Sequence, residues 1–198
     1  MVGLQVVKVG GSLCEPTLLP DLIDWLDAAW HAGPLLVVCG GGRYADTVRI
    51  EQQRLGLSDL TAHRQALLCM EQTAWALQQA WQQRHQRAPV VRSDLAPDTL
   101  WTPRALLPDH LQVAADWQMT SDSLAAWVAG QAGACALTVL KALDCGELQA
   151  GAHAGQLADW SAQGWVDARF ASHARPAQMS VRLLGQRAWR TTAVTAAT

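Results

Sequence analysis

The stretch Val6-Val7-Lys8-Val9-Gly10-Gly11-Ser12-Leu13 decides how the rest of the chain folds around it. A short apolar run ends in a lysine, two glycines and a serine, and the segment Leu18–Trp30 that follows carries apolar residues at helical spacing. A strand, a glycine loop and a helix in this order direct backbone N–H groups and the positive end of a helix dipole toward one place. The stretch therefore predicts an anion site, and a phosphate group suits it.

Lys8 stands out because lysine is rare in this chain. Of 15 basic residues, only Lys8 and Lys141 are lysine, and the others are arginine. An ammonium group is a compact, mobile charge that a planar guanidinium does not replace at every site. Both lysines follow apolar, strand-like runs. We therefore expect the two lysines to share one site.

A second strand and glycine loop repeat this logic. Residues 4–9 and the run Leu35–Cys39 read as buried strands, and the helix between them makes a βαβ unit with parallel strands. The second strand ends in Gly40-Gly41-Gly42, before a helix predicted near residues 45–55. Both loops should then meet at the carboxyl edge of the sheet, where such folds bind ligands. Two adjacent anion sites suggest a phosphoryl donor facing an acceptor, although the glycine triplet alone fits a tight turn equally well.

Asp122 lies in the first turn of a helix predicted to end near Gly130, with Thr120 or Ser121 as the capping residue. The helix dipole favours a carboxylate there, with or without a function. The apolar run that follows this helix predicts a strand that ends in Lys141. This second lysine should therefore also lie at the carboxyl edge of the sheet.

The remaining segments predict ordinary elements. A long helix should begin after Ser58 and run to about residue 84, with His63 in its first turns, either near an acidic substrate or in solvent. Further predictions are short strands at 90–91 and 99–101, a helix at 156–162, and a closing hairpin with strands at 179–184 and 188–194.

Composition narrows the class of protein. With 198 residues, half of them hydrophobic and 16% charged, one compact domain is expected. A net charge of −2 gives no electrostatic reason to expect a nucleic-acid partner. No apolar stretch reaches the roughly 18 residues that span a bilayer, and the chain opens directly on a strand, so we expect a cytoplasmic protein away from membranes. The five cysteines lack C-x-x-C spacing and predict neither disulfides nor a metal site.

Taken together, these motifs resemble the amino-acid kinase superfamily, which includes acetylglutamate, uridylate, aspartate and isopentenyl phosphate kinases. The motifs that carry the resemblance are Lys8-Val-Gly10-Gly11-Ser12, the Gly40–Gly42 loop, Ser121-Asp122, and the strand into Lys141 and Asp144. They fall within residues 4–75 and 117–146. The resemblance implies an α/β fold, a three-layer αβα sandwich with a mainly parallel central sheet. It also implies one domain over residues 1–198, with an acceptor-binding half (1–105) and a nucleotide-binding half (106–198).

Within the superfamily, the chain is most similar to the small kinases of methanofuran biosynthesis. The similarity lies in the short length, the loop at residues 40–49, the segment at 57–63, and Trp117-x-x-Thr-Ser-Asp-Ser. These kinases resemble aminomethylfuran phosphate kinase, which converts a phosphate monoester to a diphosphate with ATP. The resemblance implies such a step in the biosynthesis of a methanofuran-type one-carbon cofactor, on a phosphate or carboxylate acceptor, in a protein that forms homo-oligomers.

The resemblance also implies residue roles. Lys8 would contact the transferring phosphoryl group, and Asp122 would orient Lys8. The acceptor would be bound by Gly40, Gly41, Gly42, Arg43 and His63. The nucleotide would be bound by Gly10, Gly11, Ser12, Lys141, Asp144 and Gly146. Mg²⁺ would be carried by the ATP, without a metal site formed by the protein.

The sequence departs from the family at one catalytic position. The second catalytic lysine of the family usually comes later, in a glycine-methionine segment that this chain lacks. Either Lys141 supplies that charge, or the protein binds a nucleotide without turnover, as a storage, scaffold or regulatory protein. We favour a catalytic Lys141, because lysine is so rare in this chain.

Overall fold

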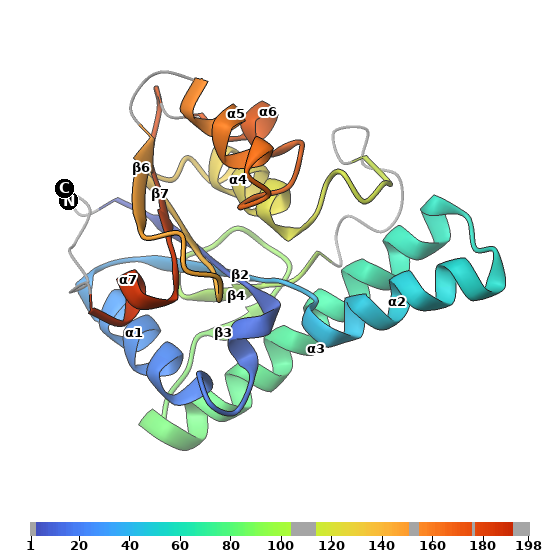
Figure 1. Cartoon of the computed structure of the whole chain (residues 1–198). Helices are drawn as coiled ribbons and strands as arrows, with labels where there is room; N and C mark the ends of the chain where they lie inside the picture. Colours follow the sequence, from blue (N-terminus) through green and yellow to red (C-terminus); the bar gives the residue numbers. More distant parts are fainter. Residues whose placement is uncertain (1–2, 104–113, 151–154, 176, 192–198) are drawn as a thin grey trace.

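A computed structural model describes residues 3–103, 114–150, 155–175 and 177–191. Over these residues the chain forms one seven-stranded sheet with the strand order β3-β4-β2-β1-β5-β7-β6. All neighbouring strands run parallel except β6 and β7, which are antiparallel. Helices cover both faces of the sheet, so the protein has three layers (Figure 1). The predicted αβα sandwich is confirmed.

The element bounds are as follows. The strands are β1 (Gln5–Val9), β2 (Leu35–Cys39), β3 (Val90–Arg92), β4 (Thr99–Trp101), β5 (Ala136–Leu140), β6 (Glu147–Ala150) and β7 (Ser180–Leu184). The helices are η1 (Gly11–Cys14), α1 (Leu19–Ala32), α2 (Gly42–Leu55), α3 (Asp59–His85), α4 (Ser121–Gln131), α5 (Gly155–Ala162), α6 (Phe170–His173) and α7 (Gln186–Thr191).

Successive side chains of β1 lie on opposite faces of the sheet and pack in two different hydrophobic cores. Val6 packs in one hydrophobic cluster with buried residues of α4, α5 and α6. Val7 and Val9 pack in a second cluster, with buried residues of α1 and α7 on the opposite face (Figure 1). Because side chains on a strand alternate, Lys8 points to the same face as Val6, toward α4. The core pattern of the sheet thus decides which helix the lysine meets.

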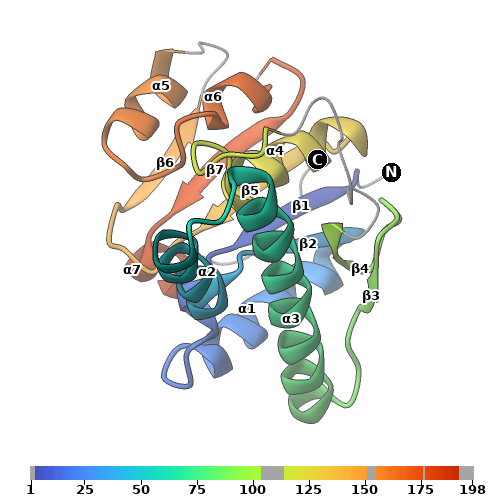
Figure 2. The same ribbon diagram turned by 90° about the vertical axis from the view of Figure 1, so that its right-hand side faces the viewer.

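The helix α3 contributes to both cores, and α2 packs beside it (Figure 2). Leu67 and Met70, in the N-terminal half of α3, join the cluster that contains Val6. Leu77 and Trp81, further along, join the opposite cluster. Ser58 caps α3 as predicted, because its Oγ atom accepts a hydrogen bond from the N–H group of Thr61 at 3.2 Å.

The closing hairpin predicted at residues 179–194 is wrong. After β7 the chain turns into helix α7, and the antiparallel partner of β7 is β6, which the sequence analysis did not predict. Gly185 permits the sharp turn, since a Cβ atom there would lie 2.5 Å from the backbone nitrogen of Cys145. Burial of Trp189 in the core beneath the sheet favours the helix over a strand. Residues 192–194 of the predicted second strand lie outside the described residues.

Candidate functional site

The two glycine loops touch each other at the carboxyl edge of the sheet. A Cβ atom on Gly11 would lie 2.1 Å from the backbone nitrogen of Gly42, and one on Gly40 would lie 2.9 Å from the nitrogen of Gly11. Gly42 also has a φ of +53°, which favours glycine. Only residues without a side chain permit this approach. The loops therefore form one continuous backbone surface.

The first glycine of each loop forms a backbone hydrogen bond to a strand of the sheet. The N–H group of Gly10 donates to the carbonyl of Leu140 at 3.1 Å, and that of Gly40 donates to the carbonyl of Val9 at 2.8 Å. The N–H group of Gly10 is thus already used within the sheet, and the binding of a nucleotide at Gly10 stays a prediction. Gly11 and Gly42 begin the helices η1 and α2, whose first N–H groups have no partner within the helix. The first N–H groups of η1 and α2 can therefore donate hydrogen bonds to an anion.

The helix predicted at Leu18–Trp30 is confirmed as α1, but a short helix that was not predicted comes before it. The loop leads into the four-residue helix η1, and α1 begins only at Leu19. In the second loop, by contrast, the 14-residue helix α2 begins directly at Gly42, three residues earlier than predicted. The positive end of a full helix dipole therefore faces the second loop, where it favours an anion.

Beside these loops, Asp122 binds both lysines of the chain. Its Oδ1 atom lies 2.7 Å from Nζ of Lys8, and its Oδ2 atom lies 2.6 Å from Nζ of Lys141. The three side chains come from β1, from the first turn of α4, and from the residue directly after β5, the strand next to β1. The side chains of Lys8 and Asp122 are 4% and 5% exposed, and that of Lys141 is 15% exposed. The lysines thus share one site, as expected, with Lys141 nearer to solvent.

Lys8, Asp122 and Lys141 form a charged triad, in which the pKa values of Asp122 and Lys8 are shifted. Burial alone would raise the pKa of Asp122, but the ammonium groups of Lys8 and Lys141 outweigh that effect and lower it. The pKa of Lys8 is lowered, mainly by burial and further by Lys141, although Asp122 opposes the shift. With Asp122 ionised and both lysines protonated, the triad carries one net positive charge. A buried excess of positive charge attracts an anion.

Asp167 fixes the helix turn that carries Asp122. Its Oδ2 atom accepts hydrogen bonds from the N–H and hydroxyl groups of Thr120, both at 2.8 Å, and from the N–H group of Ser123 at 3.0 Å. The hydroxyl of Ser123 donates to the other carboxylate oxygen. Thr120 is the N-cap residue of α4, one of the two predicted candidates, but its side chain makes no capping hydrogen bond, and the distant carboxylate of Asp167 accepts from the N–H group of Ser123 instead.

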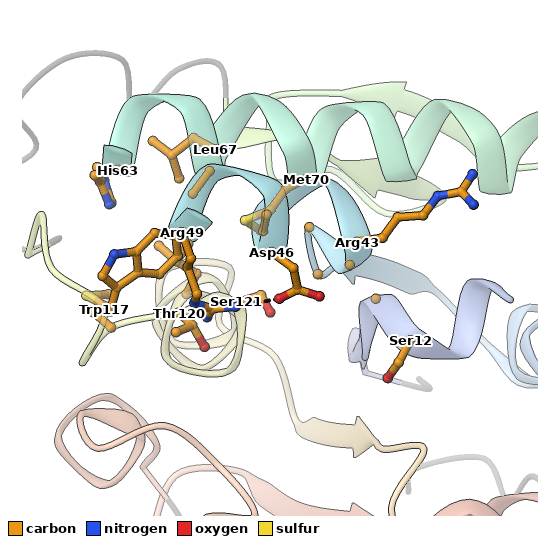
Figure 3. A pocket seen from close by; sticks show the side chains of 18 of the residues that line it. Ser12, Arg43, Asp46, Arg49, His63, Leu67, Met70, Trp117, Thr120 and Ser121 are labelled. Atoms are coloured by element: carbon orange, nitrogen blue, oxygen red, sulfur yellow. Dashed lines mark hydrogen bonds and ion pairs between the residues drawn. The ribbon is translucent and has the colours of Figure 1, made fainter. Parts of the chain in front are cut away.

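A cavity of about 300 Å³ opens beside the contact of the two glycine loops. It runs from the loops, near Ser12 and Arg43, to a far end formed by His63, Arg49 and Trp117 (Figure 3). All residues predicted to bind an acceptor line it: Gly40, Gly41, Gly42, Arg43 and His63. Gly11 and Ser12 from the first loop line it as well.

No protein-family model matches the sequence, and no curated protein matches it. Solved structures, however, match nearly the whole chain. Uridylate kinase from Archaeoglobus fulgidus matches with a TM-score of 0.66 over 91% of this chain and 89% of its own, at 17% identity. UMP kinase from Ureaplasma parvum matches with a TM-score of 0.64 over 96% of this chain and 92% of its own, at 13% identity. Aspartate kinase from Synechocystis matches with 0.68 over 97% of this chain and 39% of its own, at 14% identity.

The chain has the amino-acid kinase fold. The fold implied by the sequence resemblance is therefore confirmed. At these low identities the structural likeness concerns the fold, and the roles of individual residues stay predictions. Within the described residues, no helix is both long and apolar enough to cross a membrane.

In this amino-acid kinase fold, four residues predicted to bind the nucleotide do not line the cavity: Gly10, Lys141, Asp144 and Gly146. Asp144 pairs with Nε of Arg187 at 3.0 Å, and both side chains are largely exposed. Gly146 has a φ of +71° and accepts a hydrogen bond from the N–H group of Gly185 at 2.7 Å. Both residues shape the turn that follows Lys141.

The far end of the cavity holds Arg49 and Trp117, which the sequence analysis did not assign, together with His63. The guanidinium of Arg49 lies over the ring of Trp117, with its carbon 4.3 Å from the ring centroid. Burial lowers the pKa of His63, with Asp116 opposing the shift, so His63 is a neutral group near pH 7. Arg43 differs from these inward-facing groups, because its guanidinium extends away from the far end and lies over Tyr44, 5.4 Å from the ring centroid (Figure 3).

Proposed function

We propose that this protein is an ATP-dependent phosphotransferase that transfers the γ-phosphoryl group to a phosphate or carboxylate of a small molecule. One observation carries the proposal: a buried carboxylate, Asp122, holds Lys8 and Lys141 side by side next to two glycine loops in contact. Phosphoryl transfer requires positioning and neutralisation of negative charge more than covalent help from the protein. This site supplies both.

The donor end of the site is built from the lysines and the first loop. Lys8 and Lys141 would neutralise charge on the phosphoryl oxygens, and the N–H groups of Gly11 and Ser12 would donate to them. Asp122 would be a positioning residue, because it touches the lysines and carries the wrong charge for a phosphate. A Mg²⁺ ion bound with the nucleotide would supply further neutralisation of the phosphates.

The acceptor end is the cavity beside the second loop. Gly41 and Gly42, at the positive end of α2, would hold the acceptor phosphate. One of its oxygens would form a bond to the γ-phosphorus while the bond to the β,γ-bridging oxygen breaks and ADP leaves. The acceptor phosphate is already ionised near pH 7, so the step balances without a proton transfer and needs no general base.

Lys141 supplies the charge that the missing late lysine would otherwise provide. It reaches the same carboxylate as Lys8, at 2.6 Å, and has the greater exposure of the two. This arrangement supports catalysis over the binding-only alternative, because one carboxylate holds both ammonium groups together beside the glycine loops. The loop motifs further support a phosphate monoester as acceptor, in the biosynthesis of a methanofuran-type one-carbon cofactor.

Mass spectrometry of the products tests this proposal. The protein is incubated with MgATP and a panel of phosphate monoesters that includes aminomethylfuran methyl phosphate, next to carboxylate acceptors. The proposal predicts ADP together with a diphosphate or acyl phosphate product. Binding of MgATP in calorimetry with no ADP formed on any acceptor would favour the storage, scaffold or regulatory alternative.

A further inference from the structure

We infer that Trp189 is a positioning residue for Lys141, and that it acts through the backbone of residues 141–146, the Lys141 loop. Trp189 lies on α7, 48 residues further along the chain. Helix α7 packs on the face of the sheet opposite to α4, the helix that carries Asp122 (Figure 1). The inference rests on the proposed function only for its effect on turnover, because the contacts that carry it lie within the protein itself.

The Lys141 loop is attached by its backbone to the segment that leads into α7. The N–H group of Lys141 donates to the carbonyl of Leu184 at 3.0 Å, and the N–H group of Gln186 donates to the carbonyl of Leu143 at 3.0 Å. The hydrogen bond from Gly185 described above joins the same two segments at the end of the loop. The start of α7 therefore fixes the backbone that follows β5.

Trp189 adds a side-chain hydrogen bond to this attachment. Its indole N–H group donates to the carbonyl of Lys141 at 3.3 Å. The ring is 0% exposed and packs in one hydrophobic cluster with buried residues of α1 and of the sheet. A ring that is close-packed on all sides has few other positions, so its nitrogen is a fixed donor. Trp189 thus holds the main chain of Lys141, while Asp122 binds its ammonium group.

Lys141 depends on this anchor more than Lys8 does. Lys8 lies inside β1, which pairs with β2 on one side and with β5 on the other, so two strands fix its backbone. Lys141 lies directly after β5, and its backbone is held by the contacts of the Lys141 loop. The two ammonium groups share one carboxylate and repel each other, which favours displacement of the more exposed Lys141 toward solvent.

Two matched substitutions separate positioning from packing. Trp189→Phe removes the indole donor and keeps an aromatic ring in the core. Trp81→Phe is the control, because Trp81 is also 0% exposed and belongs to the same hydrophobic cluster. Its indole N–H group donates to Oδ1 of Asp27 on α1, at 2.9 Å. Each variant therefore loses one indole hydrogen bond and the same side-chain volume, but only Trp189→Phe loses a contact with Lys141.

Acetylation of lysine under native conditions tests the position of Lys141 without ATP. The chain holds only two lysines, so mass spectrometry assigns each product to Lys8 or Lys141. We expect Trp189→Phe to raise the acetylation rate of Lys141 by about two- to tenfold, the range that the loss of one hydrogen bond gives, without a rise at Lys8. Trp81→Phe should match the wild type. An unchanged rate at Lys141, or an equal rise at both lysines or in both variants, would overturn the inference.

Turnover tests whether this positioning serves the reaction. At a temperature where all variants are folded, Trp189→Phe should lower kcat by about two- to tenfold, more than Trp81→Phe does. Arg54→Ala, which replaces an exposed arginine on α2 outside the cavity lining, should match the wild type. In the Lys141→Met background, Trp189→Phe should have no further effect on kcat, because the residue through which it acts is gone. An equal fold loss in both backgrounds would assign Trp189 to structure alone.

The inference and the proposed function fail separately. Faster acetylation of Lys141 in Trp189→Phe, in a protein whose wild type forms no ADP with any acceptor, would retain the positioning of Lys141 and overturn the kinase activity. ADP formation by the wild type together with an unchanged acetylation rate in Trp189→Phe would retain the kinase activity and overturn the role of Trp189.

Discussion

The Nζ atom of Lys141 lies 2.6 Å from Oδ2 of Asp122, and the two residues come from different layers of the protein. The other oxygen of the same carboxylate binds Lys8. One buried negative charge thus fixes the spacing of two positive charges at the end of adjacent strands. Removing any member of the triad should change both the charge and the geometry of the site.

Asp122→Asn should abolish activity and destabilise the protein. The substitution leaves two ammonium groups close together without their shared counter-ion, and breaking a buried ion pair in this way costs about 3–5 kcal/mol. Urea denaturation measures the free energy of unfolding. An unchanged urea midpoint together with unchanged activity would show that the triad contributes neither to stability nor to catalysis.

The same carboxylate predicts a pH dependence of stability. The pKa of Asp122 is lower in the folded protein than its ordinary value, so its contribution is present above the unfolded pKa. The contribution is lost as pH falls through the lowered pKa. In Asp122→Asn, the loss of stability on acidification, measured by urea denaturation between pH 7 and pH 3, should be smaller than in the wild type. An equal loss of stability on acidification in the two proteins would show that Asp122 does not cause this pH dependence.

Lys8 predicts an alkaline limit for activity. Its pKa is lowered by burial and by Lys141, so the ammonium form should be lost below the ordinary pKa of a lysine. If the charged form is required, kcat/KM should fall at a pH below that value. A profile that stays flat up to the ordinary lysine pKa would contradict the requirement.

Gly11→Ala should displace the glycine loops, because the new Cβ atom would lie 2.1 Å from the nitrogen of Gly42. We expect a loss of stability together with a severe loss of activity. Gly130→Ala is the matched control, since a Cβ there would meet nothing within 4 Å beyond its chain neighbours and the backbone of its own helix, α4. That variant should be neutral or more stable by about 0.5–1 kcal/mol. Thermal unfolding and activity assays compare the two.

Asp167→Ala should lower kcat although Asp167 lies outside the cavity lining. Removal of the carboxylate leaves the N–H groups of Thr120 and Ser123 without their partner, at a cost of about 1–2 kcal/mol for a lost helix cap. If Asp167 positions Asp122, kcat should fall at a temperature where the variant is fully folded. A variant that is less stable but has normal kcat would assign Asp167 to stability alone.

Local patterns in the sequence predicted much of the fold and of the site. Lys8, the glycine loops and Lys141 follow apolar runs, and parallel neighbouring strands bring their ends to one edge. Asp167 could not be assigned in this way, because its partners lie 44 and 47 residues away in the chain. The contact of Arg49 with Trp117 likewise depends on tertiary packing.

The two errors in the tail have similar physical causes. Strand β6 contains a glutamate and a glutamine, and no apolar run marks it. Residues 188–194 looked like a strand by local propensity, but burial of Trp189 against the sheet makes α7 the better solution for the described part of that segment. In both cases long-range packing outweighs the local preference.

The most direct test of the central claim compares Lys141→Met with the wild type and with the control Arg54→Ala, by the rate of ADP formation with the best acceptor from the panel. Lys141 and Lys8 are proposed to neutralise the same transferring phosphoryl group, so loss of Lys141 should slow turnover by about 100-fold or more. Arg54→Ala should match the wild type. Wild-type turnover in a folded Lys141→Met protein would contradict the account.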